Sequence, residues 1–425
     1  MLESLVESAF EYAYPLFAVA HTRFRAVQDP GNTQRHPPNT VRHERHLSDH
    51  HSRWITAPNN DTLYSNAWLD LSHGPVQVRV ATLPAGRYWS VAFMDAFTNH
   101  IAMLGQRLDG IGPADVTLVG PGQHDASLPG RVIRAPGNDV WLFGRWLVDG
   151  AEDLSYAYAM QRQLEVLAPA STGQALRVAP GAATDARNFL AVVNESLAHN
   201  PPPAHESELW RCWEIIGLRP GAVDAWSTVS EDARTAWTIN IVAAFERLRI
   251  AGASGRTNIH GWVASGPEIG NFGANFALRA SVALGGLGAL EPVEARYFVK
   301  FHDQAMHGLD GRNRYVLRVP PAGIPTDSFW SFSMYAPTAD GKRVFVENPI
   351  RRYSIGNRTP GLVSNADGSL DISLQHKAPG DPRRLANWLP TPAGPFQISL
   401  RAYLPSQALL DGSVEMPTVI FIDGP

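Results

Sequence analysis

A run of short polar side chains precedes the first strand that the sequence predicts. It spans residues 59–62 and is followed by Tyr64. A carboxylate such as Asp61 can act as a general base and a tyrosine hydroxyl such as that of Tyr64 as an acid, while Asn60 can bind a substrate. Asx side chains also cap turns. Three roles stay open for Asp61: a base, the partner of a buried cation such as Arg87, or a turn cap.

Arg87 and Asp95 are the first and last residues of the next candidate segment, a predicted strand in which side chains alternate between two faces. Both therefore share one face. One interpretation places both at the rim of a sheet, where they are solvated or paired with neighbours in surface salt bridges. The other makes Arg87 an anchor for a carboxylate or phosphate and Asp95 a base, with Arg107 as a further substrate-binding residue.

The C-terminal part of the chain carries a strand with one wholly polar face. Residues 397–403 alternate so that Arg401 and Tyr403 share this face, which is either solvated or lines a cavity; we expect the cavity. Tyr335 is a second candidate acid. The candidate site residues of this part are Trp330, Tyr335, Arg352, Arg401 and Tyr403.

Five of the 15 histidines lie between residues 36 and 51. His46 and His50 would share a face on a helix, as metal ligands often do, but Leu47 stands where a metalloprotease has a glutamate. We expect a solvated, partly helical loop and no metal. No phosphate-binding loop, dinucleotide fingerprint or nucleophile elbow occurs, so we expect no cofactor.

Composition limits the kinds of partner. A net charge of -4 with both signs scattered makes nucleic acid an unexpected partner. The only cysteine, Cys212, excludes an internal disulfide, and we expect it to be buried beside Trp213. The N-terminus carries acids where a signal peptide has basic residues, and no apolar run is long enough for a membrane span, so we expect a soluble, cytoplasmic protein.

Two segments of the chain are similar to each other. Residues 78–95 and 317–335 each read as a strand, a Pro/Gly turn and a second strand, and Trp89 aligns with Trp330. With 425 residues, two domains are expected. The predicted fold class is α+β, with two jelly-roll-like β-sandwich domains, an N-terminal helix and a helical insert. The predicted parts are a helix over 1–27, interrupted or kinked at Pro15, a first β domain over 28–150, a mainly helical insert over 151–296 and a second β domain over 297–425.

Spacing also gives individual elements. The clearest predicted strands are 68–71, 76–80, 88–94, 115–119, 130–134, 140–147, 329–335, 343–346, 370–375, 396–403 and 418–422. Helical spacing occurs over 156–167, 186–197, 206–216 and 231–250.

Several motifs carry a resemblance to a known family. They are residues 56–65, 69–72 and 86–88 in the first part, and 329–331, 348–356, 367–369, 387–390 and 400–403 in the second. These motifs resemble bacterial proteins with paired domains of unknown function 1254 and 1214, over nearly the whole chain. The resemblance implies jelly-roll-like β domains and a helical portion, and it implies no settled activity.

Two functions follow as expectations. The first is a cofactor-independent enzyme, a hydrolase or lyase, with Asp61 or Asp95 as base, Tyr64 or Tyr335 as acid and Arg87 or Arg401 as anchor. The second is a protein that only binds a small organic ligand. We expect the polar motif to line a partly apolar cavity, and homo-oligomerisation is left open. The aromatic side chains expected to close this cavity are Trp54, Tyr64, Trp68 and Phe97.

Overall fold

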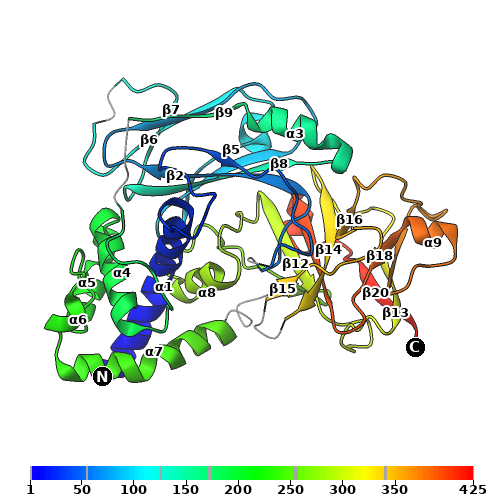
Figure 1. Cartoon of the computed structure of the whole chain (residues 1–425). Coiled ribbons are helices and arrows are strands. Elements are labelled where there is room, and N and C mark those ends of the chain that lie inside the picture. Colours follow the sequence, from blue (N-terminus) through cyan, green and yellow to red (C-terminus); the bar gives the residue numbers. More distant parts are fainter. Residues whose placement is uncertain are drawn as a thin grey trace.

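The computed structural model describes residues 2–53, 56–124, 127–169, 175–251, 257–338 and 342–424. These residues form an α+β structure with ten helices and 20 strands in four sheets (Figure 1). Two β regions and a group of helices make up the structure. Figure 1 shows most of the helices gathered below the first β region and to the left of the second.

The N-terminal helix α1 (Leu2–Val27) is the centre of the helical group. Its apolar stripe packs against α4 (Ala186–His199), α7 (Glu231–Ala251) and α8 (Phe276–Gly285). The helix continues through Pro15 instead of ending there. The C-terminal part of α1 reaches the first β region (Figure 1).

Two shorter helices, α5 (Ser207–Glu214) and α6 (Ala225–Thr228), complete this group after the 3₁₀ turn η2 (Ala204–Glu206). Trp210 and Trp213, three residues apart on α5, both face the core. Cys212 lies between them on the opposite side of the helix and is exposed, so the expectation of a buried cysteine is wrong.

The first β region contains two sheets. The larger has the strand order β1-β2-β8-β4-β5 and the smaller the order β7-β6-β3-β9, with β6 and β7 parallel. One hydrophobic cluster takes side chains from both sheets. The strands are β1 (Arg42–His43), β2 (Thr62–Asp70), β3 (Val76–Val80), β4 (Trp89–Met94), β5 (His100–Gly105), β6 (Ala114–Val119), β7 (Arg131–Arg134), β8 (Asp139–Leu147) and β9 (Leu164–Leu167).

The second β region also contains two sheets around one hydrophobic cluster. The larger has the order β10-β11-β12-β19-β14, in which β15 and β16 also pair with β14; the smaller has the order β18-β17-β13-β20, with β17 and β18 parallel. The strands are β10 (Thr257–Ile259), β11 (Trp262–Ala264), β12 (Ala295–Lys300), β13 (Arg314–Val319), β14 (Trp330–Pro337), β15 (Arg343–Val344), β16 (Ser354–Gly356), β17 (Leu370–Gln375), β18 (Trp388–Pro390), β19 (Gln397–Tyr403) and β20 (Thr418–Asp423).

The two β regions share one topology. The order β2-β8-β4-β5 corresponds to β12-β19-β14-β16, and β7-β6-β3-β9 corresponds to β18-β17-β13-β20, with the parallel pair at the same place in each. Trp89 and Trp330 begin the corresponding strands β4 and β14. The predicted correspondence of these two tryptophans is therefore confirmed by the strand order.

Strand register extends this correspondence to single residues outside the segments aligned by sequence. Ser90 on β4 pairs with Arg145 on β8, which pairs with Tyr64 on β2. Ser331 on β14 pairs with Arg401 on β19, which pairs with Tyr297 on β12. Arg145 is thus the counterpart of Arg401, and Tyr64 is the counterpart of Tyr297.

The structure differs from the predicted elements in a few places. The segment predicted as one helix over 156–167 is α3 (Leu154–Gln161) followed by β9, which pairs with β3, so the first β region continues past residue 150. Strands β5, β16 and β18 have too few residues in clear alternation to be found from the sequence. The remaining helical segments are η1 (Ala151–Asp153), α2 (Gln106–Asp109), α9 (Pro382–Ala386) and α10 (Gln407–Asp411).

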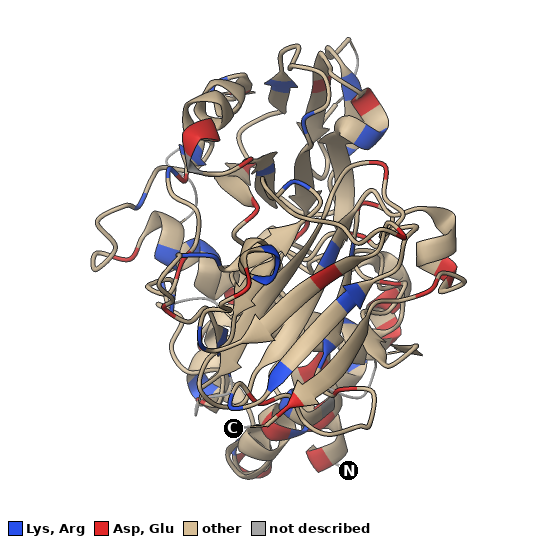
Figure 2. Cartoon of the chain, turned by 90° about the vertical axis from the view of Figure 1, so that its right-hand side faces the viewer, with Lys and Arg blue, Asp and Glu red and all other residues tan. Residues whose placement is uncertain are grey.

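Charges of both signs are interspersed on the surface, and some of them form ion pairs. Figure 2 shows Lys and Arg interspersed with Asp and Glu over the strands that face the viewer. In the smaller C-terminal sheet, for example, Arg318 on β13 pairs with Asp371 on β17 at 2.7 Å. Among the described residues, no helix is both long and apolar enough to cross a membrane.

Candidate functional site

The two larger sheets contact each other through the faces that point away from their own cores. Tyr88 and Leu147 of the first region form an apolar cluster with Phe329 and Tyr403 of the second. The ring of Tyr403 stacks on Phe329 at 4.2 Å between centroids and meets the edge of Tyr88 at 4.8 Å. Charged and hydroxyl side chains surround these rings. We call this group the inter-sheet cluster; it consists of Asp61, Tyr64, Tyr88, Arg145, Glu294, Tyr297, Ser331, Tyr335, Ser354, Arg401 and Tyr403.

A segment of the first region, residues 56–61, crosses to the second region, and we call it the docking loop. Arg401 donates from Nη2 to the carbonyl oxygens of Ala57 at 3.0 Å and Pro58 at 3.2 Å. Its Nη1 donates to the Ser333 hydroxyl at 2.6 Å. Tyr335 accepts from the same guanidinium at 2.6 Å and donates to the Pro58 carbonyl. Arg401 is therefore fully engaged in holding the loop.

The backbone of the docking loop is strained where Arg401 holds it. Ala57 has a φ of 50°, in the left-handed region that a side chain disfavours. Such a conformation persists only where surrounding contacts fix it. Besides Arg401, the Ala57 amide donates to the Arg343 carbonyl at 2.8 Å. The contacts of this loop thus hold a conformation that it would not keep alone.

Asp61 ends the docking loop and is a buried carboxylate that joins the two regions. Its Oδ2 accepts from the Ser331 hydroxyl at 2.6 Å and its Oδ1 accepts from the Ser354 hydroxyl at 3.1 Å. Burial raises the pKa of Asp61, while Arg401 and the two hydroxyls act in the opposite direction. The turn cap is Asn59, whose side-chain oxygen accepts from the Asp61 amide at 2.9 Å. The capping role considered for Asp61 therefore belongs to Asn59.

Arg145 is the buried cation of the first region, with 4% of its surface exposed. Its Nη2 donates to the Gly288 carbonyl at 2.6 Å, and its Nη1 has no hydrogen-bond partner among the described residues. The guanidinium lies 4.5 Å from the ring centroid of Phe143 and 5.7 Å from that of Tyr64. The two equivalent arginines therefore have different partners.

Glu294 is a fourth buried charge of the cluster. Its Oε1 accepts from the Tyr88 hydroxyl at 2.9 Å and its Oε2 accepts from Arg107 Nε at 2.8 Å. Burial raises the pKa of Glu294, against the effect of Arg107 and Tyr88. Arg107, a predicted binding residue, thus reaches the cluster through Glu294 and keeps about a third of its side chain exposed.

The structure brings together about half of the predicted site residues. The inter-sheet cluster contains Asp61, Tyr64, Tyr335, Arg401 and Tyr403. The polar face of β19 is buried against the first region and is not solvated, although Arg401 itself is occupied by the docking loop. Its predicted role as a free anchor is therefore not supported by its contacts.

Two predicted site residues of the first region lie elsewhere. Arg87 pairs with Asp149 at 2.7 Å and also with Asp153, so the alternative of a rim residue paired with neighbouring charges holds. Asp95 accepts from the amides of Phe97 and Asn99, both at 2.9 Å, and closes a turn. Neither contacts Asp61.

Three further predicted residues have local structural contacts. The Asn60 side chain donates to the Ser48 carbonyl at 2.5 Å. Trp330 lies in the hydrophobic core of the second region. Arg352 donates to the carbonyls of Ala386 and Trp388, both at 2.9 Å, and so fixes the loop after α9.

The aromatic residues expected to close a cavity are spread over several places. Tyr64 belongs to the inter-sheet cluster and stacks on Phe143 at 4.8 Å. Trp68 packs under α1 with Val19, and Phe97 packs on Tyr12. Trp54 lies outside the described residues. Only Tyr64 of the four is therefore placed at the cluster.

Several members of the cluster could not be predicted from the sequence. Ser331 and Ser354 lie within the family-like motifs, but serines in strands are too common to be selected. Arg145 is recognised only from strand register, in which Gly144 to Leu147 corresponds to Leu400 to Tyr403. Glu294 and Tyr297 carry no signal before the strand pairing is known.

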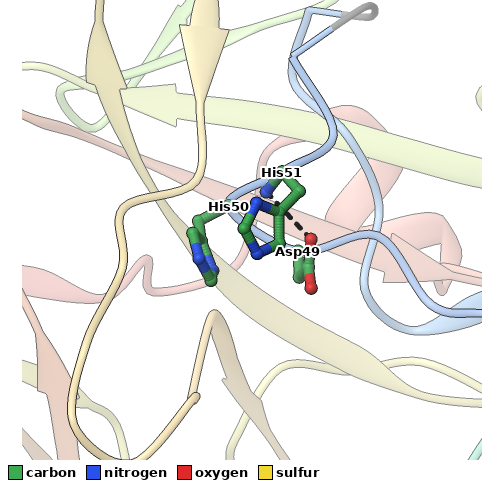
Figure 3. Close-up of side chains that lie close together, drawn as sticks. All are labelled: Asp49, His50 and His51. Carbon is green, nitrogen blue, oxygen red and sulfur yellow. Dashed lines mark hydrogen bonds between the residues drawn. The ribbon is translucent and has the colours of Figure 1, made fainter.

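The histidine-rich stretch forms loops and the short strand β1, without the helix considered for His46 and His50. Asp49, His50 and His51 have ligand atoms within 4.8 Å of one another (Figure 3). Asp49 Oδ1 already accepts from the His51 amide at 2.9 Å, and His50 Nδ1 lies 2.7 Å from the Tyr353 hydroxyl. That the protein binds no metal stays a prediction.

Comparisons with known proteins agree with the duplicated β architecture. Two family models match: "Protein of unknown function (DUF1254)" over residues 38–168 and "Protein of unknown function (DUF1214)" over residues 294–407. The first match ends beside β9 and the second begins beside β12. The first model therefore covers the strands of the first β region, and the second covers those of the second region except β10, β11 and β20.

Two solved structures are similar. The VPA0106 protein from Vibrio parahaemolyticus is 22% identical, with a TM-score of 0.75 and full coverage of both chains, and shows the same fold. An uncharacterised protein from Burkholderia cenocepacia is 15% identical, with a TM-score of 0.47, over 98% of this chain and 88% of the other. A search of curated proteins found no match.

Proposed function

We propose that this protein, which belongs to the family that pairs DUF1254 with DUF1214, is an enzyme acting on a small organic molecule by acid/base chemistry. The reaction is a hydrolysis or an elimination, and the inter-sheet cluster is its site. Asp61 is the group that accepts and returns the proton. This proposal keeps the enzyme class expected from the sequence and takes its base, Asp61, and its acid, Tyr64, from the predicted residues. It leaves out Asp95 as a base and Arg87 as an anchor.

One observation carries the proposal: the buried carboxyl group of Asp61 lies between the two β regions and has a raised pKa. A carboxylate with a pKa nearer to neutrality accepts a proton more readily and still returns it. Ser354, which donates to Asp61, is partly exposed. It connects the buried carboxylate to accessible surface.

The tyrosines of the cluster supply a candidate acid. The Tyr335 hydroxyl is engaged by Arg401 and the Pro58 carbonyl. The Tyr64 hydroxyl has no hydrogen bond to any described residue, and the side chain is partly exposed. In this mechanism Asp61 takes a proton from water or from the substrate, and Tyr64 donates a proton to the leaving group.

A second function is a small-molecule binding protein without catalysis. The observation that favours it is that both oxygens of Asp61 already accept hydrogen bonds from serines of the second region. Asp61 would then fasten the docking loop, and the cluster would bind its ligand with the remaining side chains.

The scaffold is part of the proposal. We infer that each β region is a two-layered, jelly-roll-like β-sandwich, supported by a single hydrophobic cluster shared by the two sheets of each region. A rigid double scaffold of this kind fixes Asp61 between two separately folded layers.

The test is the Asp61→Asn variant, which keeps the shape of the side chain and removes its charge. The wild-type protein is screened with p-nitrophenyl esters for hydrolysis and with 3-hydroxy acids for elimination. We expect Asp61→Asn to lower kcat by at least about 100-fold, with a melting temperature within a few degrees of the wild type. Turnover at the wild-type rate would remove Asp61 from the mechanism.

The matched control is Asp95→Asn. Asp95 is also buried, and burial also raises its pKa, but its oxygens cap a turn away from the cluster. We expect its kcat to stay within about threefold of the wild type. Saturable ligand binding by the wild type without turnover in either screen would favour the binding protein instead.

A further inference from the structure

The two arginines at equivalent places in the duplicated sheets differ in what they hold. Arg401 donates to the docking loop, to Ser333 and to Tyr335. Arg145 donates to one carbonyl, that of Gly288, and its buried Nη1 has no partner among the described residues. The duplication therefore leaves one of two matching guanidinium groups partly unused.

We propose that Arg145 binds the carboxylate of a small organic acid through Nη1, at the inter-sheet cluster. The ligand class is thereby specified for the inter-sheet cluster. The inference rests on the proposed function only in taking this cluster as the ligand site. The ligand is a monoanion with an apolar or aromatic body.

The unused Nη1 donor favours a ligand that accepts a hydrogen bond. A guanidinium removed from water loses its hydration, and a buried donor without an acceptor is costly. Buried polar groups of proteins are nearly always paired, so an exception points to a group that a ligand or water completes. With 4% of its surface exposed, Arg145 is such an exception.

The charge balance around Arg145 also favours an anionic ligand. No carboxylate of the described residues lies within ion-pair distance of its guanidinium. Glu294 has its oxygens occupied by Tyr88 and Arg107, and Asp61 has its oxygens occupied by serines. A buried cation without a direct counter-ion favours an anion, and a single open Nη1 suits one negative charge better than the two of a phosphate.

The surroundings of the guanidinium suit a carboxylate with an apolar or aromatic body. Four tyrosines interact electrostatically with Arg145: Tyr64, Tyr88, Tyr297 and Tyr403. Tyr64, Tyr297 and the neighbouring Phe143 keep some accessible surface although Arg145 itself is buried. Tyrosine hydroxyls can donate to the second carboxylate oxygen, and the rings can contact an apolar body.

The experiment is calorimetric titration of the purified full chain with benzoate, acetate and the neutral analogue benzamide. We expect saturable binding of benzoate, and binding of benzamide at least about tenfold weaker. Equal affinity for benzoate and benzamide, or no binding of either carboxylate up to about 10 mM, would overturn the proposal. Inorganic phosphate as tight as benzoate would overturn the choice of a monoanion.

The variant test compares Arg145→Met with Arg87→Met. Arg87 is also a partly buried arginine, but its guanidinium is paired with acids outside the cluster. We expect the affinity for benzoate to fall at least about tenfold in Arg145→Met and to stay within about threefold in Arg87→Met. Unchanged benzoate binding in a folded Arg145→Met variant contradicts the proposal. If this variant fails to fold, the comparison of benzoate with benzamide on the wild type still decides.

Asp61→Asn separates this inference from the proposed enzymatic function. If wild type and Asp61→Asn both bind benzoate but the wild type turns over no substrate, the role of Arg145 is supported and the catalytic proposal is rejected. Turnover that depends on Asp61, in a protein without carboxylate binding, supports the catalysis and rejects the role of Arg145.

Discussion

The two β regions build the same sheet and use its outer face differently. Both place a serine, an arginine and a tyrosine side by side across three strands: Ser90, Arg145 and Tyr64 in the first, Ser331, Arg401 and Tyr297 in the second. In the first region this arginine has one carbonyl partner. In the second it makes four hydrogen bonds, two to carbonyls of the docking loop and two to hydroxyl groups.

The residues between these shared positions explain the difference. Ala92 and Met103 of the first sheet correspond in register to Ser333 and Ser354 of the second. Phe143 likewise corresponds to Ser399. The first face is apolar where it packs against helices and aromatic rings, whereas the second is polar where it receives the docking loop. One scaffold thus supports a packing surface in one copy and a hydrogen-bonding surface in the other.

The largest expected difference between the two regions is in the unfolding free energy lost when either equivalent arginine is replaced by methionine. Arg401→Met removes the donor to two carbonyls and the cation nearest to Asp61, so we expect a loss of about 3–5 kcal/mol of unfolding free energy. Arg145→Met removes one hydrogen bond and an unpaired buried charge, so we expect a loss of about 1 kcal/mol or less. Urea unfolding of the two variants measures both, and equal losses would contradict the comparison.

The second-largest expected effect concerns the partly buried His100, whose pKa is influenced by Arg145. Burial, with a further contribution from Arg145, lowers the pKa of His100 to about 4 from 6.5. The unfolded chain then binds more protons than the folded one between these values, so stability falls as the pH drops from 6.5 toward 4. The slope from this residue is about 1.4 kcal/mol per pH unit at most.

His100→Gln tests this contribution in unfolding experiments between pH 7 and pH 4. We expect the variant to lose less stability than the wild type over that interval, by up to about 3 kcal/mol at the acidic end. The exposed His51, changed to Gln, is the control and leaves the slope unchanged. The corresponding strand of the second region, β16, contains no histidine, so this contribution is confined to the first region. If His100→Gln leaves the pH dependence of the unfolding free energy as in the wild type, the titrating group is not His100.

The smallest expected difference is in the stability lost when either of the equivalent serines, Ser331 and Ser90, is replaced by alanine. Ser331→Ala removes a donor to the Asp61 carboxylate and is expected to cost about 1–2 kcal/mol. Ser90 accepts a bond from Tyr88, whose hydroxyl also reaches Glu294, so Ser90→Ala is expected to cost less than about 1 kcal/mol. Thermal unfolding measures the stability lost in each variant. A larger loss for Ser90→Ala than for Ser331→Ala would contradict the conclusion that the second region has the more polar face.

The internal repeat and the helical stretches could be predicted from the sequence because they depend on local spacing. The segments around Trp89 and Trp330 alternate clearly, and helices α4, α5 and α7 follow from apolar periodicity. The strand β9 was not predicted, because four residues that continue a helical pattern become a strand only by pairing with β3. Pairing between distant segments is not encoded in local spacing.

The site could be predicted only where polar residues are unusual for their surroundings. Asp61, Arg401 and Tyr403 stand out as polar groups in otherwise apolar or turn-forming motifs. Arg87 and Asp95 stand out equally, yet their partners are local, and the sequence does not reveal that Asp149 and Asp153 lie beside Arg87. Arg145 was missed because its neighbours are apolar, and only its cross-strand register connects it to Arg401.

The contacts of the docking loop also determine the order in which the protein can assemble. Asp61 and Ser331 are separated by 270 residues along the chain, and Asn59 and Tyr403 by 344. During synthesis the loop therefore emerges long before its partners, and closing so long a segment has a large entropic cost that slows folding. Each β region can form its own core first, but the strained loop becomes fixed only when the last strands have docked. The inter-sheet cluster is thus a late product of folding, and a truncated chain that keeps every residue up to Ser354 would still lack it.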